Sequence, residues 1–93
     1  MTPNAPRFKL GDKVRISLQY WHTELRGAIG TIARPSECML ENDPRWSDCW
    51  RLEFTAPGEV IVYWIDFHEP WPGNDPRHPI DGAEVDEADL ELL

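Results

Sequence analysis

The residues of this chain that could do chemistry are most concentrated between positions 63 and 81. The segment YWIDFHEPWPGNDPRHPID holds two histidines, four acidic residues, two tryptophans and four prolines. Such a set could serve acid–base catalysis, metal binding, or a stiff loop that contacts a partner. Proline lacks an amide donor and has a fixed φ, so we expect no strand pairing from Pro70 onward and a stiff loop over residues 71–81. Asp81-Gly82 would then turn the chain back toward residues 83–85. The histidines and acids would form the solvated side of that loop.

A zinc site is the first metal-binding hypothesis, because two thiolates and two imidazoles suit tetrahedral zinc. The spacing matches no zinc-binding module, and neither C-x-x-C nor H-x-x-x-H occurs. Calcium is disfavoured as well, since Asn74, Asp75 and Asp81 lack the alternating order of a calcium loop. We therefore predict no metal and no cofactor, and expect both cysteines to pack as small apolar side chains. The rejected zinc ligands are Cys38, Cys49, His68 and His78.

Enzymatic activity is not expected. A nucleophile needs a base beside it and a third group that holds the base, and no serine in this chain has flanking residues of that kind. The acids at positions 37 and 41 disfavour a thiolate at Cys38. Asp66 and Glu69 could form an acid–base pair, but a domain this small offers little burial to separate their pKa values. The sequence predicts a protein that is not an enzyme.

The charge is strongly uneven along the chain. Residues 1–34 carry six Lys/Arg against two acids, whereas residues 35–93 carry three Arg against fifteen acids, and the net charge is −8. Nucleic-acid binding depends mainly on Lys and Arg, so the acidic total argues against it. The electrostatic field of this negative charge favours a protein partner with a basic surface.

Other global features restrict the location. No apolar run exceeds residues 60–65, far short of the roughly 20 residues that span a bilayer. The N-terminal residues lack the apolar stretch of a secretory signal, and two cysteines are too few for a disulfide framework. We expect a cytoplasmic protein with reduced thiols and no membrane association.

Period-two alternation predicts the fold. Apolar and polar residues alternate over 12–18 and 49–54, and residues 28–34 indicate another strand. Residues 60–67, which are dense in β-branched and aromatic residues, indicate a fourth, and a short helical turn at 87–89 precedes a last strand at 90–92. About five short antiparallel strands in 93 residues protect their edges best by closing into a barrel. The prediction is an all-β, single-domain SH3-like barrel over residues 1–93, with residues 1–7 as a flexible arm and residues 35–48 as a long polar loop. Self-association through an exposed strand edge stays open.

The five tryptophans indicate an interaction surface, because a core of this size cannot enclose all five with paired indole N–H groups. Trp50 and Trp64 lie in predicted strands, and the other three lie in predicted loops. Loop aromatics next to proline and arginine are typical of protein interfaces, although they also cover barrel ends. A groove between loops 19–26 and 71–79 would hold the partner. The predicted partner-binding residues are Tyr20, Trp21, Trp46, His68, Glu69 and Trp71.

Several short motifs resemble one family. They are Phe8-x-x-Gly11-Asp12-x-Val14-Arg15-Ile16, His22-Thr23, Arg26-Gly27-x-x-Gly30-x-Ile32, Ile65-Asp66-Phe67 with Glu69, Trp71 and Gly73, and Val85 with Leu90-Glu91. This pattern resembles the SH3-like barrel of nitrile hydratase β subunits, although residues 38–48 look unlike that family. The opening also resembles photosystem I subunit IV, the variable chain of ferredoxin–thioredoxin reductase, and KOW-type barrels.

The resemblance implies an accessory role. In the nitrile hydratase family the metal sits on a cysteine-rich segment of the α subunit, and no such segment occurs here. One fold hosts many functions, so the resemblance alone does not assign one. The first functional hypothesis is a non-catalytic protein-interaction module. The second is an accessory subunit or activator of a nitrile hydratase-type enzyme. The third is a KOW-like RNA or ribosome contact through Lys9, Lys13, Arg15 and Arg26.

Overall fold

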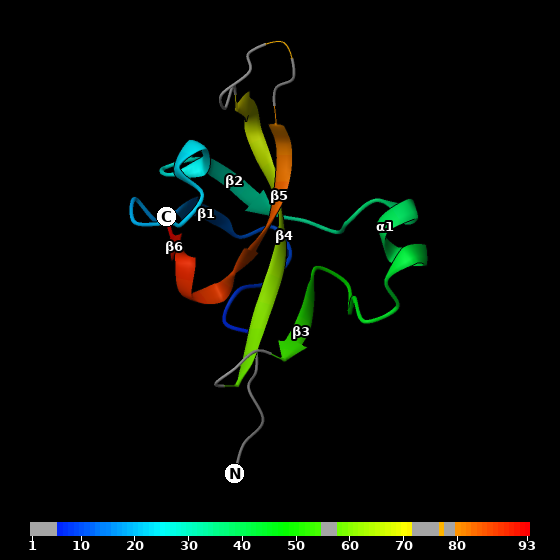
Figure 1. Cartoon of the computed structure of the whole chain (residues 1–93). Helices are drawn as coiled ribbons and strands as arrows, with labels where there is room; N and C mark the ends of the chain where they lie inside the picture. Colours follow the sequence, from blue (N-terminus) through cyan, green and yellow to red (C-terminus); the bar gives the residue numbers. More distant parts are fainter. Residues whose placement is uncertain (1–5, 55–57, 72–76, 78–79) are drawn as a thin grey trace.

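The computed structural model describes residues 6–54, 58–71, 77 and 80–93, which form one antiparallel six-stranded sheet with little helix (Figure 1). The predicted all-β class is confirmed. The elements in chain order are β1 (Lys13–Ile16), η1 (Thr23–Leu25), β2 (Ile29–Ile32), α1 (Glu37–Asn42), β3 (Trp50–Phe54), β4 (Glu59–Trp71), β5 (Ile80–Asp86), η2 (Glu87–Asp89) and β6 (Leu90–Leu92).

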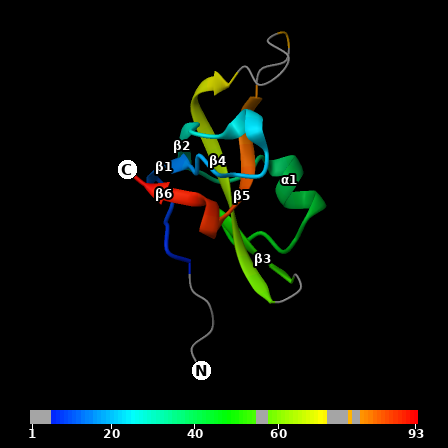
Figure 2. The same cartoon turned by 60° about the vertical axis from the view of Figure 1, so that its left-hand side comes forward.

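Strand β4 is the centre of the sheet, because it pairs with β2, β3 and β5. The Trp64 amide donates to the Cys49 carbonyl, and the Trp64 carbonyl accepts from the Ala33 amide. Both backbone groups of one strand residue point to the same edge, so β3 and β2 follow one another along one edge of β4. Strand β5 pairs along the other edge. The chain then passes through η2 into β6, which pairs with β1, and the sheet curls around on itself (Figure 2).

The core lies inside this curl and follows the period-two pattern. On β1, Val14 and Ile16 are buried while Lys13 faces solvent, and on β4 the buried inner residues are Ile61, Tyr63 and Ile65. Each buried branched side chain contributes about 1.5–3 kcal/mol relative to an exposed one. The predicted alternation of buried and exposed residues is therefore confirmed on β1.

Gly30 on β2 allows two strands to approach closely. It lies across from Phe67, and a Cβ at this position would lie 2.5 Å from the carbonyl oxygen of Asp66 and 2.6 Å from Ile65 Cγ2. Only a residue without a side chain fits against that backbone.

Two details of the strands differ from the prediction. The sheet has six strands, because Ile80–Asp86 forms β5, which we expected to be mostly loop and turn. The expectation that the chain cannot pair from Pro70 onward is also wrong, since β4 continues through Pro70 and Trp71 pairs with Ile80. Proline is compatible with an extended backbone where its missing N–H is not needed for the ladder. Residues 72–76, 78 and 79, with the other predicted loop prolines, lie outside the described residues.

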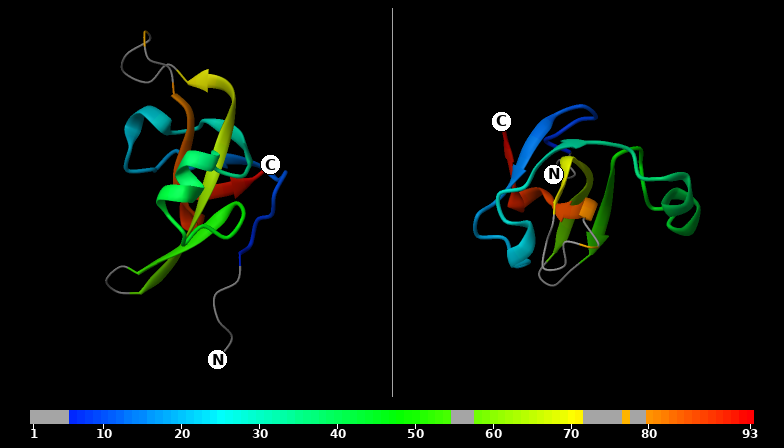
Figure 3. Two further views of the ribbon diagram at one scale, coloured as in Figure 1. Left: turned by 90° about the vertical axis from the view of Figure 1, so that its right-hand side faces the viewer. Right: turned by 90° about the horizontal axis from the view of Figure 1, so that it is seen from above.

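The predicted polar loop at 35–48 contains a short helix. Ser36 caps α1, because its Oγ accepts a hydrogen bond from the Met39 amide at 3.3 Å. No residue of α1 is fully buried, and the helix projects away from the strands (Figure 3). One capping serine before a helix of only six residues is a weak signal in the sequence, which is why we expected only a loop.

Tyr63 fastens the N-terminal segment to η2. Its hydroxyl donates to Glu87 Oε2 at 2.7 Å and accepts from the buried Phe8 amide at 3.1 Å, and Glu87 Oε2 also accepts from the Arg7 amide at 3.0 Å. Burial, followed by the hydrogen bond to Glu87, raises the pKa of Tyr63. The predicted flexible arm therefore has its last residue tied to the sheet, while residues 1–5 lie outside the described chain.

We expect Tyr63→Phe to lower the free energy of unfolding by about 1–2 kcal/mol, because the Phe8 amide would be buried without an acceptor. Urea denaturation followed by tryptophan fluorescence measures the loss. Glu87→Gln keeps an acceptor oxygen for the Tyr63 hydroxyl and should cost less than Tyr63→Phe. Equal losses in the two variants would contradict this account of the contact.

Candidate functional site

The structure describes the side chains of five of the six predicted partner-binding residues, and these lie in different surroundings. Trp21 is 75% exposed, whereas Tyr20 and Trp46 are buried. His68 and Glu69 are exposed near the end of β4, and His68 Nε2 lies 2.7 Å from Thr31 Oγ1. Trp71 belongs to β4, but its side chain lies outside the described part, as does most of loop 71–79. The expected groove between the two loops therefore stays a prediction, and Trp21 is the best candidate for a contact.

Residues 17–28, which we call the Trp21 loop, are held firmly against the sheet. The Ser17 amide donates to the Asp89 carbonyl at 2.8 Å, and the Gly27 amide donates to the Ile16 carbonyl at 2.9 Å. Arg26 Nε donates to the Tyr20 carbonyl at 2.6 Å. Leu25 of η1 is buried and anchors the middle of the loop in the core.

The Trp21 ring is oriented by its neighbours along the chain. Its centroid lies 5.0 Å from the His22 ring in an edge-on arrangement and 5.6 Å from the tilted Tyr20 ring. His22 Nδ1 is in turn in contact with the Glu24 carboxylate. Leu18, which is 63% exposed, extends the apolar surface of the same loop. The loop thus presents an exposed indole flanked by the rings of its two chain neighbours.

Two acidic side chains influence the ionisation of Tyr20. Burial, Asp86 and Asp89 in that order raise the pKa of Tyr20, while a side-chain hydrogen bond with Trp21 acts in the opposite direction. The pKa of Asp86 is itself raised by burial, then by the nearby charges of Asp89 and Glu53. The two carboxylates therefore repel each other next to the Trp21 loop.

A buried arginine on the outer face of the sheet was not expected. Arg51 is 6% exposed, although the alternation of β3 placed it on the solvent side. Its Nη1 donates to Glu84 Oε1 at 2.7 Å and its Nη2 donates to Glu53 Oε1 at 2.7 Å. Its guanidinium carbon lies 4.7 Å from the centroid of the Trp46 ring. Trp46 therefore covers Arg51, and the pairing of Arg51 with Glu84, 33 residues away, leaves no local signal in the sequence.

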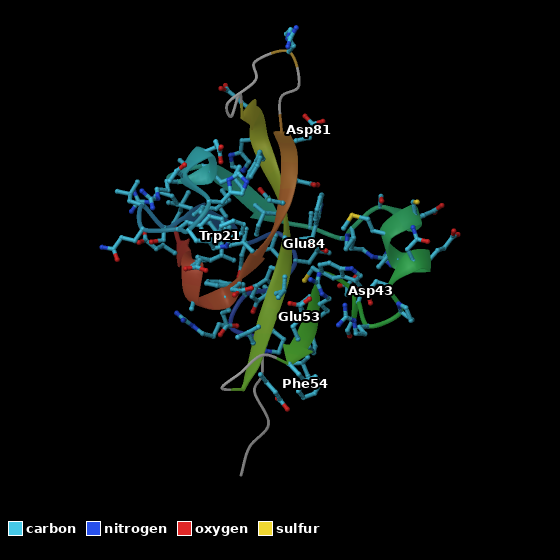
Figure 4. All side chains as sticks on the ribbon, in the orientation of Figure 1. Trp21, Asp43, Glu53, Phe54, Asp81 and Glu84 are labelled. Carbon is cyan, nitrogen blue, oxygen red and sulfur yellow. The ribbon has the colours of Figure 1, made fainter. Side chains whose placement is uncertain are left out.

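The segment between α1 and β3 is fixed by further ion pairs. Arg45 Nε and Nη2 donate to the two oxygens of Asp43, each at 2.9 Å. The hydrogen bond from Arg45 lowers the pKa of Asp43 to about 2, so Asp43 stays ionised at all but strongly acidic pH. Arg34 pairs with Asp48 at 2.9 Å. These ion pairs fix the segment that carries Trp46, and Figure 4 labels Asp43 at its start.

The zinc candidates do not gather in the described part. Cys38 is exposed on α1, so the expectation that it packs as a small apolar side chain is wrong, because the helix projects into solvent. Cys49 is buried as expected, and burial raises the pKa of its thiol. His78 lies outside the described residues. Among those that are described, no three His, Cys, Asp or Glu side chains group to hold a metal ion.

The groups considered for other functions are mostly engaged in local structure. Ser17 Oγ accepts from the Gln19 amide, and Asp66 Oδ1 accepts from the Trp64 indole at 2.7 Å. Of the basic residues proposed for RNA, Arg15 pairs with Glu91 and Arg26 binds a backbone carbonyl, while Lys9 and Lys13 are exposed.

Comparisons of the chain with protein-family models, with curated proteins and with solved structures find no match. The likeness to nitrile hydratase β subunits thus stays a prediction from motifs. In the part of the chain that the structure describes, none of the helices has the length and apolar character needed to cross a membrane.

Proposed function

We propose that this protein is a non-catalytic protein-interaction module, built on an SH3-like barrel, in which the Trp21 loop is the contact surface. The observation that carries the proposal is the exposed Trp21 ring on a loop fixed by backbone and side-chain contacts. A large aromatic side chain that is already ordered loses little conformational freedom on binding, and tryptophan is enriched among residues that dominate binding energy. Leu18, an exposed apolar residue of the same loop, would add to the contact surface.

The barrel assignment is supported by connectivity. The chain runs from β5 through the short η2 turn into β6, which pairs with β1 at the opposite end of the sequence. Such connectivity is what a small closed barrel around one core would have.

The matched control for Trp21 is Phe54. Both are exposed aromatic residues, at 75% and 79%, and they lie in different parts of the molecule (Figure 4). Immobilised wild type, Trp21→Ala and Phe54→Ala are each incubated with nuclease-treated lysate of the source cells. The captured protein is identified, purified and titrated against each variant.

We expect Trp21→Ala to weaken binding of the captured partner by about tenfold or more, as truncation of a dominant interface residue does. Phe54→Ala should bind like wild type. Equal affinity of wild type and Trp21→Ala would overturn the proposed contact surface.

The same experiment separates the two other functions. A partner with a cysteine-rich metal-binding segment would support an accessory subunit of a nitrile hydratase-type enzyme. Loss of all captured material after nuclease treatment would support the RNA-binding alternative.

A further inference from the structure

Strand β5 lies at an edge of the sheet. In the described part of the chain it pairs with β4 alone, and Figures 1 and 3 show β5 beside β4 with no further strand along its other side. An unpaired strand edge presents a row of backbone N–H and C=O groups that can pair with another chain. The edge of β5 is therefore a place where a polypeptide could bind through its main chain.

The direction of the β5 backbone groups follows from Trp64. Both backbone groups of Trp64 bond to residues on the far edge of β4, one just before β3 and one just after β2. Glu84 lies directly opposite Trp64, so these two residues exchange no hydrogen bonds and the N–H and C=O of Glu84 point away from β4. The same holds two residues to either side. The residues with outward-pointing backbone groups form what we call the β5 edge: Gly82, Glu84 and Asp86.

The side chains of the β5 edge select the charge of the strand that could pair there. Asp86 lies across β4 from Arg51, so the side chains of Asp86 and Glu84 share the outer face of the sheet with Arg51. The buried Arg51 is divided between acids, because it donates to both Glu84 and Glu53. Its charge also opposes the rise that burial causes in the pKa of Asp86. One positive charge among three carboxylates leaves this side of β5 negative.

We propose that the β5 edge binds an extended segment of a partner protein as a further antiparallel strand, with lysine or arginine side chains across from Glu84 and Asp86. Main-chain hydrogen bonds would supply the affinity, and the alternating basic side chains would supply the specificity. Opposite charges directly across a strand pair stabilise it. All strand pairs among the described residues are antiparallel, and this pairing is slightly the more stable one.

A second copy of β5 is the other strand that this edge could take. It would bring its own Glu84 and Asp86 to the same outer face, where like charges destabilise a strand pair. A basic strand of another protein therefore suits the edge better. The proposed strand uses no residue of the Trp21 loop, so this inference goes beyond the proposed function and does not rest on it.

The test uses a short fluorescein-labelled peptide in which lysine and threonine alternate, together with two N-methylated forms of it. In an antiparallel pair the residue opposite Glu84 exchanges two backbone hydrogen bonds with it, so the lysine amides would face β5. One form is methylated on the lysine amides, and the other is methylated on the threonine amides, which would face away. All three peptides carry the same charge, and fluorescence anisotropy gives their affinity for the wild type.

We expect methylation of the lysine amides to weaken binding more than about tenfold, because each methyl group removes a donor from the new ladder. Methylation of the threonine amides should change the affinity less than about threefold, since these amides form no bond with β5. Equal weakening by the two patterns would overturn the proposal, because binding would then follow charge alone. A stronger effect of threonine methylation would also overturn it.

Two substitutions of Glu84 locate the bound peptide. Glu84→Gln loses the charge and keeps the outward amide, whereas Glu84→Pro loses both. Proline is compatible with an edge strand where its missing N–H would face solvent. We expect Glu84→Pro to bind the unmodified peptide at least about threefold more weakly than Glu84→Gln. Equal affinity of Glu84→Pro and wild type would place the peptide elsewhere and overturn the proposal.

The comparison of the methylated peptides uses only the wild type, so it decides the matter even if Glu84→Pro does not fold. Sedimentation velocity of the wild type, with and without the unmodified peptide, tests the other occupant. We expect the wild type to sediment at the same rate over a range of concentrations, apart from the small mass of bound peptide. A wild-type dimer that the peptide converts to a monomer would assign the β5 edge to a second copy and overturn the proposal.

Discussion

Gly30→Ala is expected to lower the free energy of unfolding by about 3 kcal/mol, the upper part of the range for overpacked cores. The added Cβ would meet the Asp66 carbonyl oxygen at 2.5 Å, and that oxygen belongs to the rigid centre of the sheet. Relief would require β2 to move away from β4, although the neighbouring Ile32 and Ile65 are paired there and almost fully buried. One methyl group would therefore disturb both the ladder and the core.

Gly58→Ala is the matched control for this prediction. The same Cβ at Gly58 meets no atom within 4 Å, so we expect a change within about 1 kcal/mol in either direction. Guanidinium denaturation monitored by tryptophan fluorescence compares the two variants with wild type. A Gly30→Ala protein as stable as Gly58→Ala would show that β2 and β4 do not approach as closely as described.

Arg51→Met should be the second most damaging change, lowering stability by about 2 kcal/mol. Removing one partner of a buried ion pair usually costs 3–5 kcal/mol, and we expect less here because both carboxylates are partly exposed. The exposed fractions of the Glu53 and Glu84 side chains are 33% and 41%. Methionine keeps most of the contact with Trp46, so the loss reports mainly on the charges left behind.

The carboxylates themselves provide the control. Combining Arg51→Met with Glu53→Gln and Glu84→Gln removes the two unpaired charges, so most of the lost stability should return. Chemical denaturation of the single and triple variants gives the comparison. A triple variant that is no more stable than Arg51→Met would mean that Arg51 acts through packing rather than through its ion pairs.

The sequence was sufficient to predict the parts of this fold that depend on local alternation. β1, β3 and β4 lie where the sequence predicts strands, and on β1 the buried Val14 and Ile16 alternate with the exposed Lys13 as expected. β5 was missed because Asp81-Gly82 resembles a turn, whereas in the sheet Gly82 accommodates the Trp64 ring, which a Cβ there would approach to 2.6 Å. The local sequence does not distinguish a glycine in a turn from a glycine in a strand that makes room for the side chain of the adjacent strand.

The candidate site was predicted only in part. Trp21 could be chosen from residue type and loop context, since an aromatic residue among polar neighbours has little core to enter. The burial of Arg51 could not be predicted, because it depends on Trp46 from one loop and Glu84 from a strand 33 residues away. The open edge of β5 likewise follows only from the order of the strands in the sheet.

The pairing of β1 with β6 has a consequence for synthesis of the chain. Arg15 and Glu91 face each other across this pair, 76 residues apart, and Leu93 also donates its amide to the Lys13 carbonyl. While residues 90–92 are still inside the ribosomal exit tunnel, β1 presents an open edge to other nascent chains. Cotranslational folding can assemble the hairpin of β4 and β5, but closure waits for the last strand. Shielding of β1 by a chaperone during that interval would raise the yield of folded protein without changing its final stability.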